Sequence, residues 1–265
     1  MATLGVRGGG AGSASRRVAR RWRLFAVPGL ILVVWATASA LHVFPEYTLP
    51  SVLTVLRALG GLLLSGEILI DVAASLVRVV AGTTLAMLLG IPLGLMIGYR
   101  RTVSDLTELP LHSLRPIPPL AWVPFALIWF GGGFGSSVFL VFLGAFFPIT
   151  LATLGGVRAV EKGHIEVART LGLNGARLMW KVVVPAALPF MLNGVRVGAG
   201  VAWMTVVAAE YFGQSHGLGA RIIQSYNLLR MDQVAVAMAF LGMVGFAMDL
   251  GIRAVSRRLV KWRPT

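Results

Sequence analysis

The sequence has no cysteine, only four histidines and few charged side chains. Without cysteine, the chain can form neither disulfides nor thiolate metal sites. No two histidines stand at a spacing that would place them together as metal ligands on one helix. Charged residues make up 13% of the chain, against roughly 25% in soluble domains. A soluble globular fold is therefore excluded, and no metal site is expected.

Motifs for catalysis are missing as well. The chain contains no GxxxxGK[ST] loop for nucleotide phosphates, no HExxH metal motif, and no histidine cluster or Ser/Lys pair within an apolar run. We therefore do not expect an enzyme, and we expect no cofactor to be bound by this chain. If its activity consumes ATP, a separate protein must hydrolyse the nucleotide.

Long apolar runs are the dominant feature that is present. The chain is 57% hydrophobic, with a mean hydropathy of +0.81. About 20 consecutive apolar residues suffice for a helix that crosses a bilayer. Six such runs occur, at approximately Leu24–Leu41, Val72–Gly98, Leu111–Phe130, Val138–Val157, Phe190–Phe212 and Val234–Ile252. The sequence predicts an all-α polytopic membrane protein with six transmembrane helices.

Basic residues give this protein a net charge of +14, and they gather in four segments. Those segments contain Arg16, Arg17, Arg20, Arg21, Arg23, Arg100, Arg101, Arg158, Lys162, Arg169, Arg177, Lys181, Arg253, Arg257, Arg258, Lys261 and Arg263. With six spans, all four segments fall on one side of the membrane, and the opposite loops hold only Arg57, Arg221 and Arg230. Lys and Arg accumulate in cytoplasmic segments. The charge therefore predicts cytoplasmic termini, and we expect no nucleic-acid partner.

This topology divides the chain into four parts. They are a basic tail (1–23), a first span with an external loop (24–71), a five-helix core (72–253) that includes a cytoplasmic segment (158–189), and a second basic tail (254–265). An alternative for the start is a cleavable twin-arginine signal with small residues near Ala38 or Ala40. Five further spans and the charge asymmetry favour an uncleaved first helix.

Glycines in two runs stand four residues apart. Gly90, Gly94 and Gly98 form one row, and Gly194 and Gly198, with Gly200 beside them, form another. Residues four apart share a helix face, and small-xxx-small rows allow close contact between membrane helices. We interpret both rows as helix-packing faces.

The third run is interrupted by prolines and cannot be one straight helix. Broken backbone at membrane depth is tolerated only where protein or a water-filled cavity covers it. Pro116, Pro119 and Trp122 are therefore candidates for a translocation pathway, with a structural kink as the alternative.

Glu210 and Asp249 are the acidic residues within the apolar runs. Asp249 stands one turn before Arg253, a favourable helical pair. Glu210 has no nearby partner before Arg221. The sequence leaves open whether Glu210 forms a structural ion pair, for example with Arg78, or belongs to the pathway.

The cytoplasmic segment ends in EVARTLGLNGARLMWKVVVPAALP, residues 166–189. The pattern predicts two short helices, the first over about 159–171. Gly172 then ends it in a left-handed conformation, Asn174 caps the next, and Pro185 and Pro189 set the start of the fifth span. Such a hairpin can lie on lipid headgroups or dock a cytoplasmic partner.

Glu166, Ala168, Gly172 and the final Leu188-Pro189 resemble the EAA loop of the permease subunits of bacterial ABC importers, with Val167 where alanine is usual. The stretches LPSVLTVLRAL, SLVRVVAGTTLAMLLGIPLGLMIGY, RPIPPLAWVPFALIWFG and GVRVGAGVAWMTVVAAE resemble the nitrate/sulfonate/taurine/bicarbonate branch of that family. The resemblance implies a type I importer permease fold and a multi-pass protein of the bacterial inner membrane.

The same resemblance implies partners and site residues. Two permease copies would form the pathway, and two cytoplasmic ATPases would bind ATP and Mg²⁺. An extracytoplasmic binding protein would deliver a small anion of the aliphatic sulfonate, taurine, nitrate or bicarbonate class. Glu166, Ala168, Arg169, Gly172, Pro185 and Pro189 would form the ATPase-coupling loop. A permease for another small solute, such as a vitamin precursor, and an ion-coupled secondary transporter are the alternatives.

Overall fold

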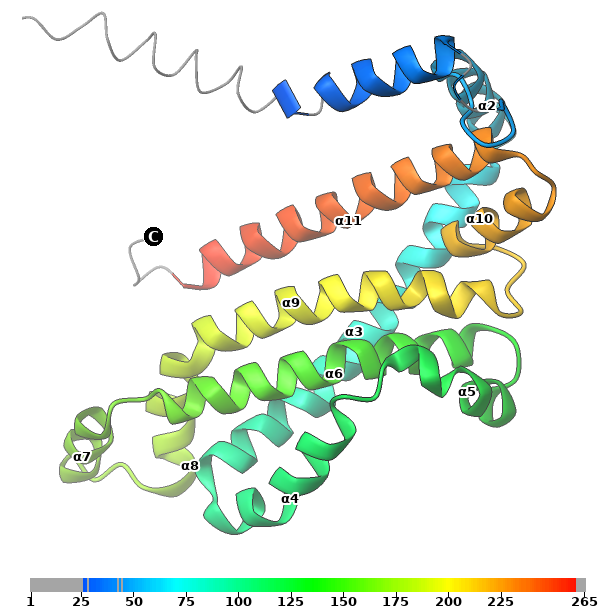
Figure 1. The fold of residues 1–265 in the computed structure, drawn as a ribbon. Helices are drawn as coiled ribbons and strands as arrows, with labels where there is room; N and C mark the ends of the chain where they lie inside the picture. Colours follow the sequence, from blue (N-terminus) through cyan, green and yellow to red (C-terminus); the bar gives the residue numbers. More distant parts are fainter. Residues whose placement is uncertain (1–25, 28, 42, 44, 261–265) are drawn as a thin grey trace, which may run out of the picture.

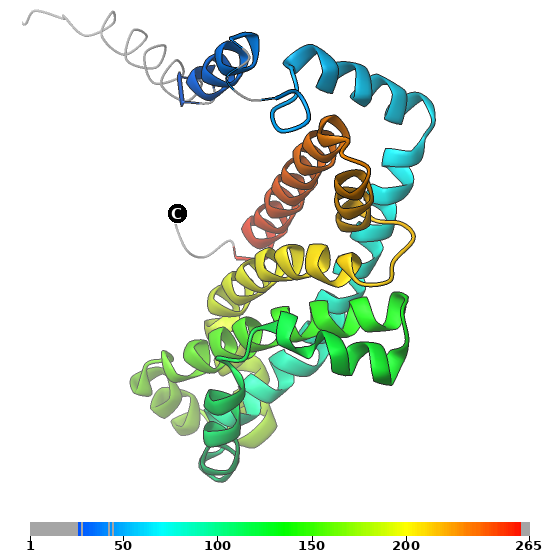
Figure 2. The same cartoon turned by 45° about the vertical axis from the view of Figure 1, so that its right-hand side comes forward.

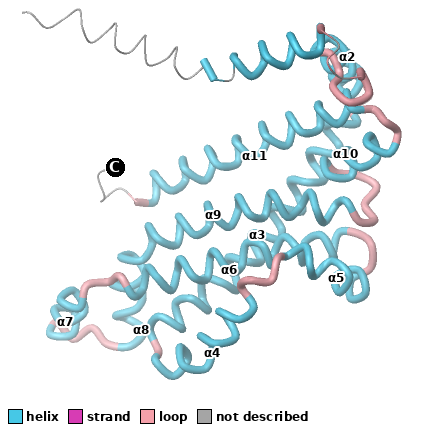
Figure 3. The backbone as a smooth tube through the Cα atoms, in the orientation of Figure 1, coloured by secondary structure: helices cyan, strands magenta, loops and turns pink. Residues whose placement is uncertain are grey.

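The computed structural model describes residues 26–260 apart from 28, 42 and 44. Nearly all of these residues are helical and none forms a strand (Figure 3), which confirms the all-α class. The basic tail 1–23 and residues 261–265 lie outside the described part of the chain. A helix at Gly29–Ala40 is followed by α2 (Val52–Leu64), α3 (Glu67–Tyr99), α4 (Arg101–Leu114), the 3-10 turn η1 (Pro119–Trp122), α5 (Val123–Phe130), α6 (Phe134–Arg158), α7 (Lys162–Thr170), α8 (Gly175–Leu178), the π-helical segment η2 (Met179–Val183), α9 (Val184–Tyr211), α10 (Leu218–Asn227) and α11 (Met231–Leu259).

In the described residues, four helical runs are long and apolar enough to cross a membrane. They are α3, α6, the continuous run from α8 through η2 to α9, and α11, and they correspond to the second, fourth, fifth and sixth predicted spans. Each begins earlier than its apolar run predicts; α3, for example, starts at Glu67 instead of Val72. At about 1.5 Å per residue the helices exceed the roughly 30 Å hydrocarbon layer, so their polar end turns remain helical beyond it.

The first and third predicted spans are not long helices in the described residues. The structure divides Leu111–Phe130, because α4 ends at Leu114 and a new helical stretch starts only at Pro119. The prolines remove backbone donors and cause this break. The helix Gly29–Ala40 adjoins residues outside the description, so the count of six spans stays a prediction.

The segment that connects α3 to α6 nevertheless crosses the molecule from one end to the other. Arg158 at the end of α6 donates a hydrogen bond to Ser104 of α4, so α6 ends beside the start of α4. Gln214 donates to the Gly133 carbonyl just before α6, at the opposite end (Figure 1). Residues between Tyr99 and Gly133 therefore make one complete crossing through α4, an irregular linker and α5.

Helix α6 lies between α3 and α9, and these three helices form the core (Figures 1 and 2). Val79 of α3, Val141 and Ile149 of α6 and Val206 of α9 are completely buried in one cluster. α11 packs beside α9 and α10 but buries only Val236 and Ala237. The most tightly packed part of the molecule is thus the α3–α6–α9 layer.

Both predicted glycine rows lie at helix contacts. A Cβ on Gly94 would come 2.6 Å from the Thr150 carbonyl oxygen, and one on Gly98 would come 2.6 Å from Val157 Cβ. A Cβ on Gly194 would come 2.5 Å from Ala152 Cβ. Gly90 and Gly198 are similarly close to Thr150 and Ile149. The packing role predicted for these five glycines is therefore confirmed in the structure.

The extension of this interpretation to Gly200 is wrong. Nothing lies within 4 Å of the Cβ position there, because Gly200 points toward a groove between α9 and α11 instead of toward α6. Conversely, Gly82 and Gly144 make equally tight contacts, with Val141 and Thr205, that the spacing of four did not reveal.

We expect Gly94→Ala to lower the thermal midpoint of the detergent-solubilised protein, because the new methyl group overpacks the α3–α6 contact at a cost of about 1–3 kcal/mol. Gly200→Ala is the matched control. It adds the same methyl group in open space and should leave the midpoint unchanged or raise it, since alanine favours a helix by up to about 1 kcal/mol over glycine. Equal midpoints for the two variants would contradict the packing role of Gly94.

Candidate functional site

The two ends of the helical core differ in chemistry. The loop end carries the turn from α3 to α4 and residues 158–183 with α7, α8 and η2; the network end carries α2, the segment 212–217 and α10 (Figure 1). Tyr99 donates to the Gly175 carbonyl at 3.4 Å across the loop end. Arg158 contacts Glu108 of α4 at 3.7 Å. The base of the loop is therefore tied to α3 and α4.

At the loop end, α7 terminates in a complete Schellman motif. The backbone N–H of Leu173 donates to the Ala168 carbonyl at 3.0 Å, and that of Gly172 donates to Arg169 at 2.9 Å. Gly172 has a φ of +81°, the left-handed conformation that the motif requires. The sequence prediction for Gly172 is confirmed. The helix itself starts at Lys162, after a turn, and not at Ala159.

One face of α7 packs and the other is open. Ala168 is 5% exposed, and its small side chain lets α7 approach the chain at η2. Glu166 and Arg169 are exposed, and in the described residues Glu166 forms no ion pair. Val167 and Leu171 are 61% and 77% exposed although both are apolar. The open face thus combines one unpaired carboxylate with a solvent-exposed apolar ridge.

The second short helix does not stand apart from the fifth span. α8 continues through η2 into α9 as one run from Gly175 to Tyr211. The backbone N–H of Val184 donates to the Met179 carbonyl, a π-type bond that lets the helix continue past the missing N–H of Pro185. Pro185 and Pro189 lie in the first turns of α9, as predicted. Asn174 occupies the N-cap position of α8, but its side chain makes no capping bond.

At the network end, Glu210 is completely buried. Arg78 Nη1 donates to Glu210 Oε1 at 2.7 Å, and Ser75 Oγ and the Gly219 N–H donate to the same carboxylate at 2.8–2.9 Å. The suggested pairing with Arg78 is confirmed. A Cβ on Gly217 would lie 2.5 Å from Glu210 Oε1, so the chain wraps this carboxylate directly with backbone.

A second buried carboxylate extends this network. Asp71 is 1% exposed and accepts hydrogen bonds from the Gly217 N–H at 3.0 Å and from Arg221 Nε at 2.7 Å. Arg221 also pairs with Glu67 at 2.7 Å. Burial lowers the pKa of the Arg221 guanidinium, but the hydrogen bonds and charges of Asp71 and Glu67 raise its pKa above the ordinary value. The Arg221 guanidinium is therefore charged at physiological pH.

Sequence reasoning missed Asp71 and Ser75. A signal was available, because Asp71, Ser75 and Arg78 follow one another at spacings of four and three and so share a face of α3. The second predicted span was placed from Val72, which put Asp71 outside it. Arg78 additionally donates to Gln214 at 3.0 Å and to the His216 carbonyl at 2.7 Å, so α3 fixes the whole segment that follows α9.

Asp249 pairs with Arg253, as predicted, at 2.5 Å. It also pairs with Arg196 of α9 at 2.5 Å, which the sequence did not indicate. The second pair joins α11 to the middle of α9. Asp249 is therefore a structural link between helices.

The pathway candidates do not come together in one place. Pro119 lines a cavity of about 370 Å³ between the proline linker, α6 and α9. Trp122 instead packs against Phe125 and Trp129, with ring centroids 5.9 and 6.5 Å apart. Pro116 is exposed in the linker, and Glu210 is enclosed at the network end. The pathway role of these four residues stays a prediction.

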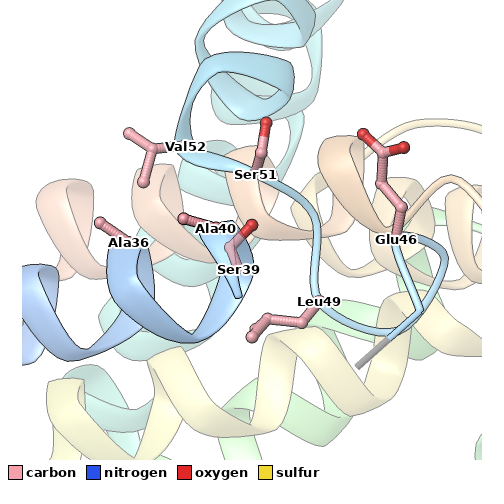
Figure 4. A pocket seen from close by; sticks show the side chains of 7 residues that line it. All are labelled: Ala36, Ser39, Ala40, Glu46, Leu49, Ser51 and Val52. Carbon is pink, nitrogen blue, oxygen red and sulfur yellow. The ribbon is translucent and has the colours of Figure 1, made fainter. Parts of the chain in front are cut away.

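Another hollow, of about 340 Å³, lies where the helix Gly29–Ala40 meets the turn before α2 (Figure 4). Ser39, Glu46 and Ser51 supply its polar groups. Glu46 accepts a hydrogen bond from Thr54 at 3.1 Å, and Trp35 Nε1 donates to the Pro50 carbonyl at 3.1 Å. These contacts hold the first helix to α2 and indicate a structural joint.

Comparison with known proteins adds three close relatives. The chain is 43% identical over 242 residues to a putative ABC transporter permease protein of Methanocaldococcus jannaschii, covering 89% of this chain and 90% of the relative. It is 34% identical to the taurine transport system permease protein TauC of Escherichia coli, with 94% of both chains covered. It is 36% identical to a putative aliphatic sulfonates transport permease protein, SsuC, of Bacillus subtilis, covering 89% and 86%.

The fold also matches a solved transporter. The inward-facing methionine ABC transporter MetNI aligns over 74% of this chain and 98% of that chain, with a TM-score of 0.65 and 17% identity. This similarity establishes the type I permease fold. Residues 90–261 match the family described as the binding-protein-dependent transport system inner membrane component. That match includes α6, the loop end and the network segment after α9. The chain belongs to this family and is a permease subunit of an ABC transporter.

Proposed function

We propose that this chain imports a small oxyanion, of the taurine, aliphatic sulfonate or nitrate class, as the permease of an ATP-driven transporter. The observation that carries the proposal is the loop end, where α7 exposes an unpaired carboxylate and an apolar ridge that suit a protein partner. Relatives named for taurine, aliphatic sulfonate and nitrate transport support the cargo class. A permease for another small solute is the alternative.

The loop end suits the transmission of movement. α7 joins the end of α6 to the start of the α8–η2–α9 run, so a partner that holds α7 is connected through the chain to both core helices. The Schellman motif at Gly172 fixes the angle between α7 and α8. Such a joint transmits a rigid-body displacement. Closure of a docked ATPase would then rotate α6 and α9 together and open the pathway to the other side.

The proposed assembly contains two permease copies, two cytoplasmic ATPases and an extracytoplasmic binding protein. The ATPases would hold ATP and Mg²⁺, and this chain would hold neither. The termini and the loop end would be cytoplasmic, because the loop end bears the basic residues. The network end, where Glu67, Asp71, Glu210 and Asp232 lie, would face the binding protein in a bacterial inner membrane.

Single cysteines test the orientation cleanly because the chain has none of its own. Asn174→Cys should resist an impermeant thiol reagent in intact cells and react after lysis. Ser215→Cys should react in intact cells, since Ser215 is exposed at the network end. Ser215 is preferable to Gln214, whose side chain holds Arg78. The reverse pattern of labelling would invert the proposed topology.

Two loop variants test the coupling. Gly172→Val places a side chain in the left-handed conformation, at a local cost of about 1–2 kcal/mol, and changes the angle between α7 and α8. Glu166→Ala removes the unpaired carboxylate without weakening the helix. Both should insert normally, yet either lose the co-purifying ATPase or hydrolyse ATP without uptake.

Gly163→Val is the matched control for Gly172→Val, because it adds the same side chain to α7 without a positive φ or a nearby atom. Arg177→Gln controls for an exposed charge in the same loop. Both controls should keep most of the uptake. Normal uptake by Gly172→Val and Glu166→Ala would show that the segment is only a linker on the membrane surface.

Glu210→Gln should lower the thermal midpoint of the solubilised protein strongly. It leaves Arg78 buried without its counter-charge, and breaking a buried pair typically costs about 3–5 kcal/mol. The double variant Arg78→Met with Glu210→Leu should recover much of that loss, whereas Glu166→Gln, at an exposed position, should change nothing. A wild-type midpoint for Glu210→Gln would contradict the stabilising role of the pair.

The double variant also tests the pathway role predicted for Glu210. If the carboxylate itself serves the cargo, the restabilised double variant must still fail to transport. Uptake by the double variant at the wild-type rate would leave Glu210 with a structural role alone.

A further inference from the structure

The cavity of about 370 Å³ between the proline linker, α6 and α9 lies deep in the membrane core. Its walls include Gly144 and Pro148 from the middle of α6 and Gly194 and Val197 from the middle of α9. Ligand pockets typically measure about 300–1,000 Å³. The cavity is therefore large enough for a small solute and lies midway between the loop end and the network end.

Arg115 is the charged side chain of this cavity. It directly follows α4 and lines the cavity together with Leu143 and Leu151 of α6. Within the described chain, no acidic residue lines the cavity, and Arg115 forms no ion pair. A charge at this depth is costly unless it faces protein or water. Arg115 is thus a cation at mid-depth without a counter-charge from its own chain.

Asn193 is the other polar side chain that lines the cavity. Arg115 and Asn193 both line the cavity and are exposed. A guanidinium offers several N–H donors in a plane that fits two oxygens of an oxyanion, and the asparagine amide can donate one more. The remaining walls are largely apolar, which strengthens the attraction between opposite charges.

We propose that Arg115, assisted by Asn193, forms an anion site at mid-depth in the translocation pathway, where it contacts the sulfonate, nitrate or similar group of the cargo. The inference rests on the proposed function and names the residues that recognise the charge. One cation with one amide makes a weak site. A translocation pathway requires weak binding, because a solute that bound tightly at mid-depth would not leave the site.

The electrostatic test needs no transport. In membranes that hold the complete transporter, Val197→Cys places the sole thiol of this chain in the cavity wall, where Val197 is 51% exposed. Its reaction rates with anionic sulfonatoethyl methanethiosulfonate and cationic trimethylammonium-ethyl methanethiosulfonate are compared. Arg115→Gln should lower the anion-to-cation rate ratio by on the order of tenfold, as expected for loss of a nearby charge in a partly apolar cavity. Arg115→Lys should preserve the ratio.

Two controls isolate the cavity. Arg177→Gln, at the loop end, should leave the ratio at Val197→Cys unchanged. Arg115→Gln should not alter the ratio at Ser215→Cys, at the network end. Excess taurine or ethanesulfonate should slow labelling of Val197→Cys with Arg115 present and not with Arg115→Gln. An unchanged ratio and no protection would overturn the anion site.

Uptake by proteoliposomes with the ATPase and binding protein provides the second measurement. Arg115→Gln should reduce ATP-driven uptake of taurine, ethanesulfonate or nitrate at least tenfold, while ATPase stimulation by the binding protein persists. Wild-type uptake by Arg115→Gln would overturn the site and leave the proposed function intact. If the wild-type complex imports none of these anions, the proposed cargo class fails, and the labelling ratio alone decides whether Arg115 makes the cavity anion-selective.

Discussion

Helix α6 packs against α3 on one side and against α9 on the other. At the closest contacts, one of the two helices has a glycine and therefore no side chain. At Gly82, Gly94 and Gly194 a Cβ would come 2.5–2.6 Å from an atom of the facing helix. Lipid tails are as apolar as leucine, so membrane helices gain little from merely leaving lipid, and close contact must stabilise their association. This contact makes three helices one body. The loop end and the network end are both built on it, because each draws its residues from these same helices.

The two ends use similar turns for different purposes. The Schellman motif after α7 has its left-handed residue at Gly172, which adopts this conformation without strain. α7 itself exposes apolar side chains to solvent. α10 ends with the same pair of backbone bonds, from Leu229 and Arg230 to Tyr226 and Ser225, yet its left-handed residue is Leu229, with a φ of +57°. A leucine in that conformation costs about 1–2 kcal/mol. The two backbone bonds at this helix end, each 2.9 Å long, hold the residue in that conformation.

Features set by local spacing could be predicted from the sequence, and features set by distant partners could not. The glycines spaced four apart and the helix end at Gly172 depend on residues within one or two turns, and both predictions were correct, whereas the extension to Gly200 was wrong. Arg78 and Glu210 were named as possible partners only because an unpaired charge within a membrane span is energetically costly. Asp71 and Arg221 are 150 residues apart, and neither segment indicates the other. The π-helical segment η2 was not predicted. It depends on how the backbone accommodates Pro185, and the spacing of apolar residues does not indicate this.

Charge pairing within the core gives Arg115 its significance. Arg78 is paired with Glu210, Arg221 with Asp71 and Glu67, and Arg196 and Arg253 share Asp249. Other cations without an acidic partner, among the residues that the structure describes, stand in or beside the polar end regions, where water solvates them. Arg115 lies between those regions, where solvation must come from a cavity. A fold that neutralises its other deep cations but leaves this one unpaired, beside an open cavity free of carboxylates, keeps a positive charge where a passing anion can use it.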